Sequence, residues 1–142
     1  MWTCSKCGTE LAARSRSRSC IDHVIAKFNS HAERETRALF RGVVKLVAAC
    51  GPYTLTSPSK GFYAFVANHH FATVNRNGAG RLDVHFALPR RLVSKRIWRI
   101  DRAGAAYMHH MRIRSANRID AELAGWLRAS YVEHGKRTAD AT

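Results

Sequence analysis

Acidic side chains are scarce in this chain of 142 residues, where 10 aspartates and glutamates stand against 24 lysines and arginines. The shortage is greatest between residues 58 and 100, in which Asp83 is the single carboxylate side chain. The chain also lacks a glycine-rich phosphate loop and a recognisable nucleophile–base–acid set. These absences argue against an enzyme. They leave a histidine-dependent enzyme for a nucleotide or another anion as an alternative, with candidate residues His69, His70, His85, His109 and His110.

Long apolar runs are also missing. No segment approaches the roughly 20 apolar residues that cross a bilayer, and the N-terminus has no apolar signal core. We therefore expect a soluble, cytoplasmic protein without a membrane partner. The apolar share of 46% is typical of a globular protein. The length allows one domain, or a small module plus a domain of about 110 residues.

What the chain has in excess is positive charge, with a net charge of +14 that peaks between residues 58 and 100. A field of this sign attracts polyanions. We predict nucleic-acid binding with little sequence preference, because Lys and Arg contact phosphates whatever the bases are. The alternative is a module that binds an acidic protein or is purely structural. The candidate contacts are Arg14, Arg16, Arg18, Arg90, Arg91, Lys95, Arg96, His110, Arg112 and Arg114.

Two aromatic residues extend this prediction. If Tyr63 or Trp98 is exposed, its ring would stack on nucleic-acid bases. Such residues more often pack within a core, so the prediction depends on their exposure.

Cysteines are few, and three of the four lie within the first twenty residues. The pairs Cys4-x-x-Cys7 and Cys20-x-x-His23 stand twelve residues apart, a pattern typical of a zinc site with four tetrahedral ligands. We therefore predict a structural zinc module, with His31 as a competitor of His23 for the fourth position. Cys50 is expected to be a core residue.

Two amphipathic helices are predicted. Within 32–50, apolar residues recur at intervals of three and four residues, which predicts the first helix. Gly51-Pro52 ends that helix. The second helix runs to Tyr131, with Asn117 as its N-cap and Asp120 supporting its first turn. Between the zinc module and the first helix, Val24 to Phe28 is interpreted as a short apolar connector.

The middle of the chain reads as strands joined by short turns, which requires antiparallel pairing. The expected strands are 53–56, 62–67, 70–75, 81–88, 97–101 and 107–114, with 97–101 at an edge. The predicted fold is α+β, with a small N-terminal zinc ribbon and a sheet of five or six strands covered on one face by two helices. The expected divisions are a zinc module at 1–30, an α+β domain at 31–134 and a polar tail at 135–142.

Alternation in 107–114 directs His109 toward the core, where we expect it to be hydrogen-bonded. The same alternation directs His110, Arg112 and Arg114 outward. With His85 from a neighbouring strand, they would form a basic surface on the uncovered sheet face.

Four stretches share a pattern with one protein family. They are Trp2-x-Cys4-x-x-Cys7-Gly8 with Ser19-Cys20, Ala38-Leu39-Phe40 up to Gly51-Pro52, Phe71-Ala72, and His109-His110-x-Arg112-x-Arg114-Ser115 leading to Ile119-Asp120-x-Glu122-Leu123-x-x-Trp126-Leu127 and Tyr131. Together they resemble the bacterial family called domain of unknown function 5655, in its form with an N-terminal zinc ribbon, over nearly the whole chain. The resemblance implies the fold and the metal module but no activity, because the family is uncharacterised.

Two further points follow from the resemblance. Related domains occur beside restriction-type modules, which favours nucleic acid as the partner. Members often have histidine directly before the Ser-Cys pair, where this chain has Arg18. The resemblance therefore leaves the fourth zinc ligand open.

Overall fold

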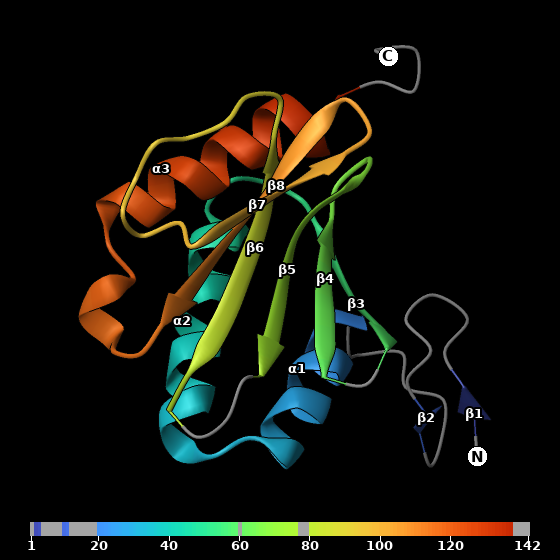
Figure 1. Ribbon diagram of the computed structural model, residues 1–142. Helices are drawn as coiled ribbons and strands as arrows, with labels where there is room; N and C mark the ends of the chain where they lie inside the picture. Colours follow the sequence, from blue (N-terminus) through green and yellow to red (C-terminus); the bar gives the residue numbers. More distant parts are fainter. Residues whose placement is uncertain (1, 4–9, 12–19, 60, 77–79, 138–142) are drawn as a thin grey trace.

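The computed structural model describes residues 2–3, 10–11, 20–59, 61–76 and 80–137. Their main body is an antiparallel sheet of six strands with three α-helices packed on it (Figure 1). The predicted α+β class and the six-stranded antiparallel sheet are therefore confirmed. The predicted zinc ligands Cys4 and Cys7 lie outside the described residues, as do Arg14, Arg16 and Arg18.

The sheet has the order β3-β4-β5-β6-β8-β7, so β8 lies between β6 and β7. As predicted, the strand formed from the 97–101 region is at an edge. A separate two-stranded pair joins β1 (Trp2–Thr3) to β2 (Glu10–Leu11). The six strands are β3 (Thr54–Ser59), β4 (Phe62–Val66), β5 (His70–Arg76), β6 (Leu82–Leu88), β7 (Arg99–Ala103) and β8 (Ala106–Ile113).

The two faces of the sheet follow from the alternation of side chains along each strand. Val84 pairs with Met111 and faces the helices, whereas the next residue, His85, pairs with His110 on the opposite face. Met111, Val84 and the other helix-facing apolar side chains form one continuous core. The register therefore separates a mainly apolar face, on which His109 is also buried, from a polar one.

The described part of the chain also contains three α-helices and two shorter helical turns. They are α1 (Cys20–His31), α2 (Arg34–Ala48), η1 (Ala116–Arg118), α3 (Ala121–Ser130) and η2 (Tyr131–Gly135). The α-helices cover one sheet face: Phe40 of α2 stacks on Phe28 of α1, whose ring also meets Tyr63 of β4. Within the described residues, no helix combines the length and apolar content that crossing a bilayer requires.

Residues 20–31 differ from their prediction. The expected apolar connector is part of α1, a helix of 12 residues in which Val24 and Phe28 are fully buried. Their spacing of four places both on one helix face, and that face packs into the core. The sheet is therefore covered by three helices and not by two.

The start of the last helix also differs from its prediction. Asn117 is not its N-cap, because residues 116–118 form the separate 3-10 turn η1 and Ile119 adopts a non-helical backbone (φ −88°, ψ 81°). Asp120 takes the capping role, and its carboxylate accepts a hydrogen bond of 3.1 Å from the Leu123 amide. Because the helical conformation is interrupted at Ile119, η1 is separate from α3, and its Arg118 lines the surface hollow described next.

Candidate anion-binding site

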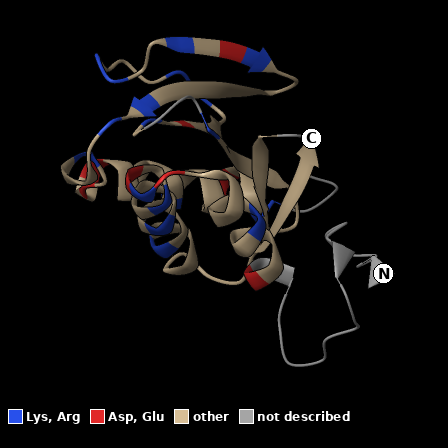
Figure 2. Ribbon diagram, turned by 90° about the horizontal axis from the view of Figure 1, so that it is seen from below, with Lys and Arg blue, Asp and Glu red and all other residues tan. Residues whose placement is uncertain are grey.

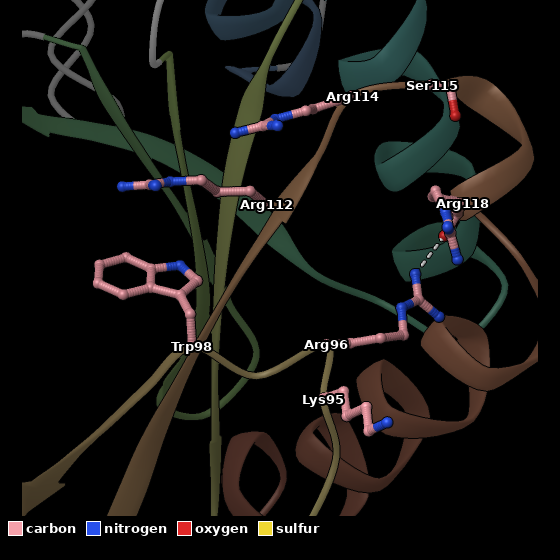
Figure 3. Close-up of a pocket in the computed structure, with 7 residues that line it drawn as sticks. All are labelled: Lys95, Arg96, Trp98, Arg112, Arg114, Ser115 and Arg118. Carbon is pink, nitrogen blue, oxygen red and sulfur yellow. Dashed lines mark hydrogen bonds between the residues drawn. The ribbon is translucent and has the colours of Figure 1, made fainter.

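A hollow of about 690 Å³ opens where the segment before β7 meets the end of β8 (Figure 3). Five of its seven lining residues are cationic. From the segment before β7 come Lys95, Arg96 and Trp98; β8 supplies Arg112; the residues after it supply Arg114, Ser115 and Arg118. No carboxylate is among these lining residues. The hollow is therefore suited to a negatively charged ligand.

Arg96 is the fixed member of this group, with a side chain only 17% exposed. Its guanidinium donates to the carboxylates of Asp120 at 2.9 Å and Glu122 at 3.1 Å, and to the Arg118 carbonyl at 2.7 Å. The Leu123 amide, with this guanidinium, keeps the pKa of Asp120 below its ordinary value. Arg96 therefore connects the hollow to the start of α3 and is itself largely neutralised.

Arg112 and Trp98 form a stacked pair at the mouth of the hollow. The guanidinium carbon of Arg112 lies 4.5 Å from the centre of the Trp98 ring, which is within the range of a cation–π contact. The Arg112 Nε also donates to the Asp83 carboxylate at 3.1 Å. Trp98 is 48% exposed. The pair is thus held in place while a large aromatic surface remains accessible.

The other three cations are Lys95, Arg114 and Arg118. None of their side chains forms an ion pair within the described part of the chain. These three exposed charges have no carboxylate partner among the described residues, so a bound anion would reduce the repulsion between them. Over the whole described ribbon, basic segments outnumber acidic ones, while β7 at the sheet edge carries both signs (Figure 2).

A pair of histidines lies beside the hollow on the uncovered sheet face. The rings of His85 and His110 are 4.1 Å apart between centres, and His110 Nε2 donates to the Asp101 carboxylate at 2.9 Å. Burial, and then the adjacent His110, lower the pKa of His85 to about 4. His85 is therefore uncharged at neutral pH and adds no charge to the anion site.

The predicted nucleic-acid contacts separate into groups. Lys95, Arg96, Arg112 and Arg114 meet at the hollow, and the ring of His110 lies 5.7 Å from that of Trp98. The structure does not bring Arg90 and Arg91 into this group. Arg90 donates to Glu133 at 2.8 Å, and Arg91 lies over the Tyr107 ring.

Sequence reasoning missed two lining residues, Ser115 and Arg118. The available signal was the continuation of basic residues beyond the last predicted strand, from Arg114 to Arg118. The two aromatic candidates also differ from one another. Tyr63 is 1% exposed and lies in the core, whereas Trp98 is accessible.

The five candidate histidines of the enzyme alternative do not converge. His85 and His110 are adjacent, but His109 lies on the opposite face, fully buried. There its Nδ1 donates to the Tyr107 carbonyl at 3.0 Å and its Nε2 accepts from the Leu92 amide at 2.9 Å, as expected for a hydrogen-bonded core residue. His69 and His70 lie at the turn into β5. In the part of the chain that the structure describes, no three His, Cys, Asp or Glu residues form a group that could hold a metal ion.

One described residue of the predicted zinc site has a distinctive environment. His23 is 5% exposed, and neither of its ring nitrogens has a hydrogen-bond partner among the described residues. A buried imidazole without partners is costly, since each nitrogen loses its contact with water. Helix α1 begins at Cys20, so His23 follows one turn later, whereas His31 ends the same helix. This environment fits a histidine that binds a metal.

Comparison with known proteins assigns the chain to a family. Residues 25–133 match the family described as Domain of unknown function (DUF5655), and the chain belongs to that family. No curated protein and no solved structure matches the chain. The match covers α2, α3, the whole six-stranded sheet and residues 25–31 of α1, but not Cys4, Cys7, Cys20 or His23.

Proposed function

Since membership of this family supplies no activity, we propose from the geometry that the protein binds nucleic acid with little sequence preference through the hollow. The observation that carries the proposal is the convergence of Lys95, Arg114 and Arg118 beside the positioned Arg96 and Arg112. The first three form no ion pair with any described residue. Phosphate groups match this arrangement, because arginine forks donate to phosphate oxygens without reading the bases. The Arg14, Arg16 and Arg18 segment would add further phosphate contacts.

Binding by this hollow predicts a strong dependence on salt. Each neutralised phosphate contributes about −0.7 to the slope of log affinity against log salt for a single strand, and about −0.9 for a duplex. Lys95, Arg114 and Arg118 alone would therefore give a slope of about −2 to −3. Contacts from the basic N-terminal segment would steepen it.

The test is a fluorescence-anisotropy titration of labelled short DNA and RNA, single- and double-stranded, at about 50 and about 200 mM salt. Arg114→Gln and Arg118→Gln should each weaken binding severalfold. Each should also make the slope of log affinity against log salt less steep by the contribution of about one phosphate contact. The matched control is Arg34→Gln, which removes one charge from an exposed position of α2 outside the hollow. Absence of binding at low salt, or equal losses in Arg114→Gln and Arg34→Gln, would contradict the proposal.

We also propose a structural zinc site formed by Cys4, Cys7, Cys20 and His23. Three thiolates and one imidazole give closed tetrahedral coordination, which stabilises a fold and leaves no position for catalysis. The imidazole of His23, buried and without a hydrogen-bond partner among the described residues, supports this ligand set. Positions 20 and 23 on a helix are separated by about 5–6 Å between Cβ atoms. Positions 20 and 31 are separated by about 16 Å along the axis, so His31 could not share a metal with Cys20.

Elemental analysis of protein purified without added zinc should give about one zinc per chain. His23→Ala and Cys4→Ser should release it, whereas His31→Ala, the matched control on the same helix, should retain it. The proposal predicts that Cys4→Ser leaves most of the six-stranded domain folded, as judged by circular dichroism. Retention of zinc by His23→Ala together with its loss from His31→Ala would reverse the assignment of the fourth ligand.

A further inference from the structure

The Trp98–Arg112 pair has properties that phosphate binding alone does not use. Trp98 exposes nearly half of its surface, although its backbone amide is fixed by a hydrogen bond of 3.0 Å to the His110 carbonyl. An exposed tryptophan on a rigid backbone is a recurrent feature of surfaces that recognise flat ligands. Phosphates carry no flat apolar surface, so they leave this indole unexplained.

Arg112 strengthens the same surface. Its guanidinium lies over the indole at 4.5 Å and donates to the Asp83 carboxylate, so two contacts hold the side chain in one orientation. The Asp83 side chain is only 10% exposed, so the carboxylate of this pair is largely desolvated, while the Arg112 side chain is 39% exposed. A planar guanidinium held in this way can itself stack on a base. Little side-chain freedom remains to be lost when a ligand binds.

Phosphates and bases are distributed differently in single and double strands. Both forms expose phosphates, so the cations of the hollow attract both. A duplex already stacks its bases on one another and presents only their edges, whereas a single strand leaves base faces free for an aromatic side chain. A hollow of about 690 Å³ has the size of a small-molecule site. A duplex, whose major groove alone is about 12 Å wide, would lie only across its mouth.

We propose that the hollow selects single-stranded over double-stranded nucleic acid, by stacking an unpaired base on the Trp98–Arg112 pair while Arg114 and Arg118 hold the flanking phosphates. This inference rests on the proposed nucleic-acid binding and adds to it a class of ligand. The recognition involves the base face and the phosphate, which RNA and DNA share. Strands of both kinds are therefore included in the test.

The experiment compares the full chain on one mixed-sequence oligonucleotide as single-stranded DNA, single-stranded RNA and the matching duplexes, by anisotropy at low salt. The expected preference for a single strand is about tenfold or more, the effect of one base–aromatic stack. Trp98→Leu should remove most of that preference while changing duplex affinity less than about twofold. Trp98→Phe, which keeps a stacking ring, should retain most of it. Thermal melting verifies that each variant is folded.

Arg112→Lys is a second, milder variant that keeps the positive charge but loses the planar guanidinium. It should lower single-strand affinity about threefold and duplex affinity by a smaller factor, because the positive charge that attracts phosphates is kept. Equal affinities of the unmodified protein for single strands and duplexes would overturn the inference and leave the proposed binding intact. Equal losses of single-strand and duplex affinity in Trp98→Leu would also overturn the inference and leave the proposed binding intact. Absence of binding to any oligonucleotide would overturn both.

Discussion

The two faces of the sheet differ most clearly at His109 and His110, neighbours in the chain with opposite surroundings. His109 faces the helices, is fully buried and stacks on Phe86, and both of its ring nitrogens are hydrogen-bonded to the backbone. His110 faces away from the helices, and its partner is the carboxylate of Asp101, which is accessible to solvent. One residue type thus serves packing on one face and surface electrostatics on the other.

This difference indicates how the site is supported. On the covered face, aromatic and aliphatic side chains from α1, α2, α3 and the sheet form one core. On the other face, Asp83 and Asp101 orient Arg112 and His110. A rigid sheet therefore carries the polar network, and loss of a core contact should cost stability, whereas loss of an outer contact should cost binding.

The largest expected effect contrasts a phenylalanine of a helix that covers the sheet with an exposed phenylalanine of the sheet itself. Phe28→Ala removes a fully buried ring that stacks on Phe40 at 3.9 Å, and should lower the free energy of unfolding by about 3–5 kcal/mol. Phe62→Ala, at a ring 37% exposed at the start of β4, should cost less than about 1 kcal/mol. Urea unfolding measures both. Similar losses in the two variants would show that α1 does not belong to the core.

Much of this architecture was predictable from local patterns, because alternation identifies strands and their faces. The run from Leu82 to Leu88 indicated its apolar face, and the run ending at Arg114 indicated the outward position of Arg112. Helix α1 was missed because its apolar positions, Val24 and Phe28, cover barely more than one helical turn. Such a short repeat is also compatible with an apolar connector.

The hollow was predictable only in part, because it depends on strand order. Arg112 follows from the alternation in β8, but its contact with Asp83 requires β6 to pair with β8 and not with β7, the next strand in the chain. Local patterns carry no information on that choice, which results from packing the whole sheet. Arg118 lines the hollow because the backbone leaves the helical conformation at Ile119, before α3 begins. This interruption accompanies the capping of α3 by Asp120.

A smaller effect distinguishes the two neighbouring histidines themselves. His109→Leu should lower the free energy of unfolding by about 1–3 kcal/mol, because the part-buried Leu92 amide and Tyr107 carbonyl lose their partner. His110→Leu should cost less than about 1 kcal/mol, since the Asp101 carboxylate remains solvated and retains its contact with Arg99. Chemical denaturation measures both losses. The comparison between the faces fails if His110→Leu is the more destabilising variant.

The smallest predicted effect concerns pH and His85. Its folded-state pKa of about 4 lies below the ordinary value of 6.5, because of burial first and the adjacent His110 second; Asp83 and Asp101 oppose the shift and Arg99 supports it. Above about pH 6.5 the ring is neutral in both states and contributes nothing. As the pH falls from about 6.5 to about 4, the unfolded chain takes up a proton that the folded chain does not, so stability decreases.

His85→Gln should remove part of this decrease, on the order of 1 kcal/mol once solvent screening of the partly exposed ring is allowed for. Burial also lowers the pKa of His109, so that residue contributes to the same pH range with the same sign. The carboxylates of Asp101 and Asp120 have pKa values below 3.8 and act only at lower pH. Urea unfolding at pH 7 and at pH 4.5, for the unmodified chain and His85→Gln, isolates the histidine contribution. Parallel losses of stability in the two proteins would show that His85 accepts a proton in the folded state as readily as in the unfolded one, and that its side of the sheet is as hydrated as an open surface.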